Sequence, residues 1–222
     1  MKQRTLAGNV AVAVFILAMW SIMVAFFSAS WLVSDYRISG AQFDRLGLWM
    51  HCFRSLPDPH DEYQRRFFSG CRWIFDPFTT GYHQIRGYLM PWFIVITQFF
   101  FLVAFLGVLV SFILVLLFVL CFGPGQKRFL QLIRLIGFIL VGAGISGGLA
   151  VIVFALFANR DGWMPGHSNN FFGWAFALAI SGVIETLIAG SLFLLEANIQ
   201  KKKQKYLANS QQKFELEQET KA

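Results

Sequence analysis

The chain has 222 residues, of which 56% are hydrophobic and only 14% are charged, and its formal net charge is +7. A soluble domain of this length is far less apolar, so the composition excludes an ordinary water-soluble fold and favours a membrane protein. The positive charge lies largely in the C-terminal tail and the short turns, where lysines anchor spans at the lipid surface; a nucleic-acid partner is therefore not expected.

Four apolar segments are each long enough to cross a bilayer, which takes about 20 mostly apolar residues in a helix. They cover about residues 8–30, 89–122, 129–157 and 171–195. The alternative for the first is a signal peptide, because Lys2 and Arg4 precede it and small residues end it. Its apolar run is longer than a signal core, however, and we therefore predict four transmembrane helices.

Basic residues predict how the chain is oriented. They lie near the N-terminus, in the short segment between the second and third spans, and after the last span. Four spans place these three segments on one side, which the positive-inside rule makes cytoplasmic. Both termini are thus predicted to be cytoplasmic, and the loops at about 31–88 and 158–170 to be extracellular.

The first extracellular loop carries the pattern of a small antiparallel sheet. Apolar and polar side chains alternate with a period of two over residues 46–52, as in a half-buried strand. A further apolar run covers residues 71–75, and glycine and proline turn signals separate the runs.

Two of the three cysteines lie in this loop, and we predict that Cys52 and Cys71 form a disulfide on the oxidising side of the membrane. Closing that loop should stabilise the sheet by about 3 kcal/mol. The alternatives are free thiols or a metal site with His51 and His60, although the spacing matches no zinc pattern. Cys121 lies at the cytoplasmic end of the second span and cannot join the pair.

The third and fourth spans each contain one ionisable residue, Arg134 and Glu185. Counting from the helix ends places them at a similar depth, so an ion pair between the two helices is preferred to a role in solute transport. Gly144 and Gly148 form a small-xxx-small pair, for which packing within the bundle is preferred to contact with a second copy.

The rest of the sequence offers no catalytic chemistry. No phosphate-binding glycine loop, catalytic-triad spacing or metal-binding helix motif occurs in it, so neither an enzyme nor a cofactor is predicted. The tail, about residues 196–222, is rich in lysine, glutamine and glutamate and is predicted to be disordered or loosely helical.

The motifs of the first outer loop resemble the signature of the claudin superfamily, which includes the peripheral myelin protein group and channel-accessory relatives. The matching residues are Trp31, Gly47, Leu48, Trp49, Cys52 and Cys71. Arg86 before the second span and Gly173-Trp174-Ala175 at the start of the fourth extend the resemblance. The abundance of phenylalanine and the long loop are most similar to insect claudin-like proteins of septate junctions.

The resemblance implies an all-α membrane protein in which residues 1–195 form a four-helix bundle with a small disulfide-locked extracellular β-sheet built from both outer loops. It also implies a structural protein of lateral cell–cell junctions in the plasma membrane. Such proteins form or maintain a paracellular barrier of the septate or tight junction type, as homo- or hetero-oligomers with claudin-like partners in the same and the facing membrane. The alternative is an auxiliary or trafficking subunit of another membrane protein, such as a channel.

Three departures from the family limit what the resemblance implies. The interval between Cys52 and Cys71 is about twice that of vertebrate claudins, so pore-lining charges are not carried over and ion selectivity stays open. The last residues, 219–222, lack the bulky apolar terminus that PDZ domains bind. Cys121 is placed like palmitoylated cysteines of the family, and a buried free thiol is the alternative.

Overall fold

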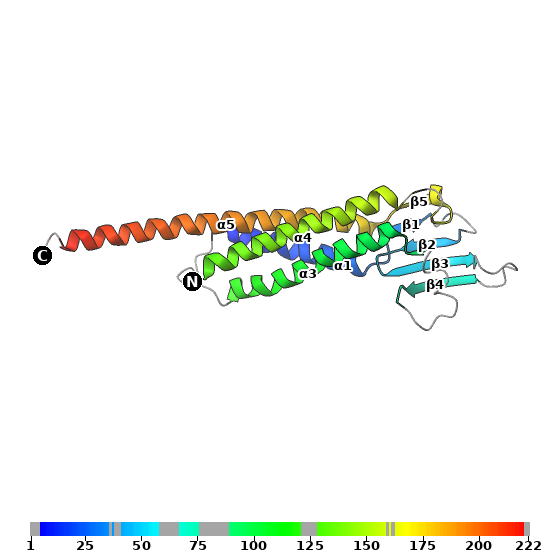
Figure 1. The fold of residues 1–222 in the computed structure, drawn as a ribbon, viewed down its shortest axis with the longest axis horizontal. Coiled ribbons are helices and arrows are strands. Elements are labelled where there is room, and N and C mark those ends of the chain that lie inside the picture. Colours follow the sequence, from blue (N-terminus) through cyan, green and yellow to red (C-terminus); the bar gives the residue numbers. More distant parts are fainter. Residues whose placement is uncertain are drawn as a thin grey trace.

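The computed structural model describes residues 5–35, 37, 41–57, 67–75, 89–120, 128–158, 160 and 163–219. Four long helices lie along one axis, and a sheet stands at one end of them (Figure 1). The helices are α1 (Leu6–Phe27), α3 (Trp92–Leu120), α4 (Phe129–Phe157) and α5 (Trp174–Glu219). All four are long and apolar enough to cross a membrane, which confirms the predicted fold class.

The observed helix ends differ from the predicted ones mainly in the fourth span. Asn170–Phe172 forms a strand, so α5 begins only at Trp174. The helix then continues without a break through the polar tail to Glu219, where the sequence had predicted disorder or a loose helix. A helix that is already nucleated gains one backbone hydrogen bond for each residue added, so the span stabilises the polar turns that follow it.

The sheet is formed from the segment between α1 and α3 and the segment between α4 and α5, the two loops that the resemblance implied. Its strands are β1 (Leu32–Ser34), β2 (Phe43–Leu46), β3 (Met50–Pro57), β4 (Phe67–Trp73) and β5 (Asn170–Phe172). They lie in the order β4-β3-β2-β1-β5, and each neighbouring pair is antiparallel. β5 comes from the second outer loop and pairs with β1, so the two loops form one sheet.

Two clusters of buried side chains fill the molecule. One joins the inner side of the sheet to the adjoining halves of the helices and contains Trp31, Phe101 and Phe154. The other lies between the helices alone and contains Phe15 and Phe193. Many large apolar side chains on the outer faces of the helices are exposed in the isolated chain, as expected where lipid is the solvent.

Glycines bring α4 and α5 close together. A Cβ at Gly144 would lie 2.6 Å from Cδ2 of Leu187, and one at Gly137 would lie 2.7 Å from Cδ2 of Leu194. A Cβ at Gly190 would in turn lie 2.9 Å from Cγ2 of Val141. Gly144 therefore packs against Leu187 of α5 within the bundle, which is the packing that the sequence favoured.

Candidate functional site

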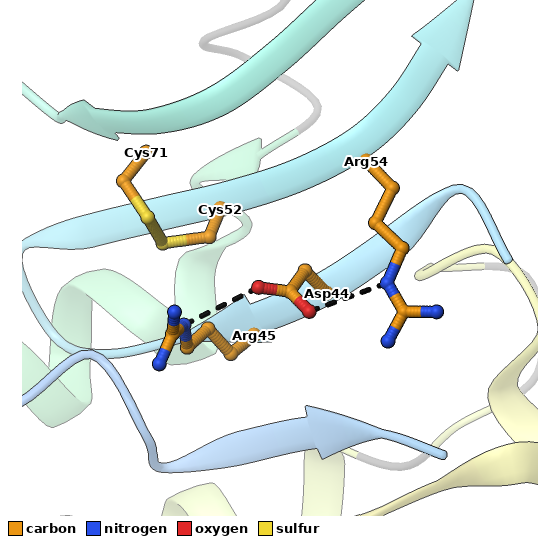
Figure 2. The surroundings of a disulfide bond; sticks show 5 residues. All are labelled: Asp44, Arg45, Cys52, Arg54 and Cys71. Atoms are coloured by element: carbon orange, nitrogen blue, oxygen red, sulfur yellow. Dashed lines mark hydrogen bonds and ion pairs between the residues drawn. A yellow bond between two sulfur atoms is a disulfide. The ribbon is translucent and has the colours of Figure 1, made fainter. Parts of the chain in front are cut away.

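The predicted disulfide between Cys52 and Cys71 is present. It joins two directly opposed residues of β3 and β4 (Figure 2). β4 is an edge strand whose side chains are nearly all exposed, so it has little buried surface to hold it in place. The covalent bond supplies that attachment, and it rules out the free-thiol and metal alternatives for these two cysteines.

A charge cluster lies beside the disulfide on β2 and β3. One oxygen of the Asp44 carboxylate lies 3.3 Å from Nε of Arg45, and the other lies 3.3 Å from Nε of Arg54 (Figure 2). The three side chains are partly exposed, so the pairs contribute little to stability. Two arginines therefore share one carboxylate on this surface of the sheet.

Trp31 connects the first helix to the sheet. Its side chain is fully buried, and its indole N–H donates a hydrogen bond of 2.7 Å to the carbonyl oxygen of Ala25. That carbonyl lies in the last turn of α1, where no further helical N–H is available to it. The ring also meets the rings of Phe101 and Phe154 edge to face, each with centroids 5.0 Å apart. The side chain of Trp31 thus caps the last turn of α1 and fills the space between the helices and the sheet.

The turn Gly47-Leu48-Trp49 joins β2 to β3 and rests on the helices. A Cβ at Gly47 would overlap the carbonyl oxygen of Ser28, so no other residue fits against this backbone. Leu48 is buried, and the ring of Trp49 lies 5.3 Å from that of Phe26 in α1. The signature turn is therefore the place where the sheet is attached to the bundle.

Sequence reasoning missed Gln98, which fixes this turn from α3. Its side-chain Nε2 donates a hydrogen bond of 2.6 Å to the carbonyl oxygen of Leu48, in a buried position. The available signal was an amide side chain within an otherwise apolar span. Buried amides need partners, so Gln98 could have been predicted to bind a loop at the outer end of α3.

Gly173 makes a matching contact at the start of α5. A Cβ at Gly173 would overlap the carbonyl oxygen of Ser30, and the Gly173 N–H donates a 2.9 Å hydrogen bond to the carbonyl oxygen of Trp31. Two glycines of the recognised motifs, Gly47 and Gly173, therefore pack against the same short segment that follows α1.

His51 is fully buried in β3. Burial disfavours the charged imidazolium and lowers the pKa of His51 from 6.5 to about 4, so the side chain is neutral at physiological pH. Cys52 beside it is held in the disulfide. Among the described residues no three potential metal ligands gather, and His60 lies outside those residues.

The structure does not bring Arg134 and Glu185 together. Gly137 packs on Leu194 and Gly147 on Val183, which places Arg134 level with about residue 197 of the antiparallel α5. At 1.5 Å per residue, Glu185 lies about 16 to 18 Å further along the bundle. Glu185 instead accepts a 3.0 Å hydrogen bond from the Ser21 hydroxyl on α1, while Arg134 is exposed. Within the described part of the chain, the predicted ion pair is therefore absent.

Glu196 is a buried carboxylate that sequence reasoning also missed, because the fourth span was expected to end one residue before it. One of its oxygens accepts a hydrogen bond from the Thr5 hydroxyl at the start of α1. The other accepts a 2.8 Å hydrogen bond from Nε2 of Gln200. A Cβ at Gly8 would lie 3.2 Å from Cδ of Glu196, so α1 and α5 meet tightly here. This carboxylate is favoured by the positive end of the α1 helix dipole.

Two predicted residues, Arg86 and Cys121, lie outside those that the structure describes. The family model for PMP-22/EMP/MP20/Claudin tight junction proteins matches residues 16–195. That range contains the second half of α1, the five strands, α3, α4 and the first part of α5. No curated protein matches the chain.

Proposed function

The chain belongs to the family of PMP-22, EMP, MP20 and claudin proteins, and we propose that it forms or maintains a paracellular barrier at lateral cell–cell junctions. Membership of the family makes it a junction-type membrane protein. The barrier role is what we propose in addition. In this proposal the sheet is the surface through which copies, or related proteins, assemble within one membrane and across two.

The observation that carries the proposal is the exposure of aromatic side chains on both edge strands of a rigidly attached sheet. On the β4 side these are Phe67, Trp73 and Phe75, and on β5 they are Phe171 and Phe172; each is more than 40% exposed. Exposed apolar side chains gathered on a surface mark sites of protein or membrane contact.

The two edges differ and lie at opposite sides of the sheet. Contacts between the β4 edge of one copy and the β5 edge of the next would be head to tail, and such contacts continue along a row instead of closing a pair. A continuous row of proteins is what a seal between cells requires. The disulfide supports this use, because it holds the outermost strand on the sheet.

The barrier proposal is tested by depletion in a polarised epithelium. We expect the protein to concentrate at lateral contacts and its loss to raise the leak of a small tracer. Uniform distribution over the plasma membrane with an intact barrier would contradict the proposal. Stoichiometric co-purification with one large membrane protein would instead support the role of an auxiliary subunit.

A rescue experiment tests the sheet edge directly. Phe67→Ser removes an aromatic side chain that is 57% exposed on β4, and Tyr206→Ser removes one that is 74% exposed on the tail helix. We expect the Phe67 variant to reach the cell surface without concentrating at contacts or restoring the barrier. The Tyr206 variant should behave as the wild type; equal rescue by both would exclude the β4 edge as an assembly surface.

A further inference from the structure

A group of basic side chains lies on α4 and α5 at the end of the bundle opposite the sheet. We define this basic collar by six residues: Arg128, Arg134, Lys201, Lys202, Lys203 and Lys205. All six side chains are exposed. The first two belong to the start of α4, and the lysines belong to α5, which runs on past the other helices (Figure 1).

The packing of α4 against α5 places the members of the collar within about 12 Å of one another along the bundle axis. Gly137 contacts Leu194, and the two helices run in opposite directions. Arg128 lies nine residues before Gly137, and Lys203 lies nine residues after Leu194, so these two residues lie at about the same level. Arg134 is level with about residue 197, roughly 6 to 9 Å nearer the membrane centre than Lys201 to Lys203. The collar is thus a band of limited depth at the end of four membrane spans.

No exposed acid offsets the collar within the described side chains. Glu196 is the acidic residue nearest to it, and it is buried and engaged by Thr5 and Gln200. The first turn of α4 contains no acidic residue, and its N-cap residue, Arg128, makes no side-chain cap hydrogen bond. The positive end of the α4 dipole therefore adds to the charge of the collar.

The lysines form a ring and not a pocket. Successive helical residues differ by about 100° in direction, so Lys201, Lys202 and Lys203 point to three sides of α5, and Lys205 repeats the direction of Lys201. A ring of flexible, solvated ammonium groups attracts negative charge without fitting the shape of one molecule. Clusters of four or more basic residues directly after a span attract anionic lipids.

We propose that the basic collar binds the headgroups of anionic phospholipids in the leaflet at its end of the bundle, and enriches them by their charge without selecting one headgroup. This inference does not depend on the barrier function, because it concerns the opposite end of the molecule from the sheet. It gives the protein a lipid shell that differs between the two leaflets.

The test uses the full chain in phosphatidylcholine bilayers with spin-labelled phosphatidylserine or phosphatidylcholine as the probe. We expect the protein to bind the phosphatidylserine probe about fivefold more strongly, the effect of one lysine acting on one headgroup. High salt should remove the difference. A labelled phosphoinositide, compared at equal headgroup charge, should show the same preference as phosphatidylserine.

Two variants separate charge from other effects. Changing Lys201, Lys202, Lys203 and Lys205 together to glutamine should lower the preference clearly and leave only the share of Arg128 and Arg134; glutamine keeps the helix propensity of lysine, so the fold is retained. Changing the same four residues to arginine should leave the preference intact. Equal binding of both probes by the wild type, or an unchanged preference in the glutamine variant, would overturn the proposal. A strong preference for the phosphoinositide over phosphatidylserine at equal headgroup charge would also overturn the proposal, because it would show that the protein selects one headgroup.

Discussion

Gly47 lies directly against the carbonyl group of Ser28, so that the turn between β2 and β3 touches the backbone at the end of α1. Backbone stands on both sides of this contact, and a Cβ at Gly47 would also lie 2.6 Å from Cα of Ala29. Neither side is the flexible end of a side chain that could move away. A single methyl group at Gly47 would therefore push the turn between β2 and β3 away from the end of α1.

This contact predicts that Gly47→Ala destabilises the protein by about 2 to 3 kcal/mol, because the overlap forces the backbone apart. Thermal unfolding of the purified protein in detergent measures the effect. The matched control is Gly142→Ala on α4, where a Cβ meets nothing within 4 Å and alanine favours the helix. An unchanged midpoint for Gly47→Ala would show that the turn is not held against α1.

The hydrogen bond from Trp31 to Ala25 makes a second prediction. Trp31→Phe keeps most of the ring contacts but removes the indole N–H, which leaves the carbonyl of Ala25 buried without its donor. We expect a loss of about 1 to 3 kcal/mol. Trp20→Phe, at a position 68% exposed on α1, serves as the control and should change the unfolding midpoint little.

The disulfide makes a third prediction. Replacing both Cys52 and Cys71 by serine should lower stability by about 3 kcal/mol, since the unfolded chain then regains the freedom of a closed loop. Reductant should lower the unfolding midpoint of the wild type to about that of the double variant, and it should leave the midpoint of the double variant unchanged. Cys121→Ser is the matched control and should leave the unfolding midpoint of the wild type unchanged. If Cys121→Ser lowered the midpoint as much as the double variant does, the disulfide would not explain the loss.

His51 makes the protein sensitive to acid. Its pKa is lowered from 6.5 to about 4 in the folded state, so below pH 6.5 the unfolded chain binds a proton that the folded chain does not. The stability present above pH 6.5 is therefore lost as the pH falls toward 4, by about 3 kcal/mol in total. Unfolding midpoints of the wild type and of His51→Gln, compared at about pH 7 and about pH 4.5, measure it. We expect a smaller drop for the variant; equal drops would assign the sensitivity to other groups.

Much of the fold followed from local features of the sequence. The third span was predicted at residues 129–157, where the structure has Phe129–Phe157, because a bilayer demands a continuous apolar run that composition alone reveals. The pairing of Cys52 with Cys71 followed because topology left these two on one side of the membrane. The family signature singled out Trp31 and Gly47, but their attachment of the sheet to the bundle was not predicted, since a period of two does not say which face meets a helix.

Other features depended on how the helices pack. Counting from predicted ends gave Arg134 and Glu185 the same depth, but the register of α4 on α5 is set by glycines such as Gly137 and separates them by several turns. The continuation of α5 into the tail also escaped a judgement based on local composition, because the preceding span supplies its nucleus.

The sequence by itself therefore determined the solvent, the four spans, the sheet pattern of the first loop and the disulfide, since each depends on residue type and spacing along the chain. Only the tertiary structure decided the partners of Gln98, Glu185 and Glu196 and the nearness of the α4 and α5 residues of the basic collar. The physical reason is that contacts between helices are set by side-chain size at the point of crossing. That register is a property of two segments together, and neither segment contains it alone.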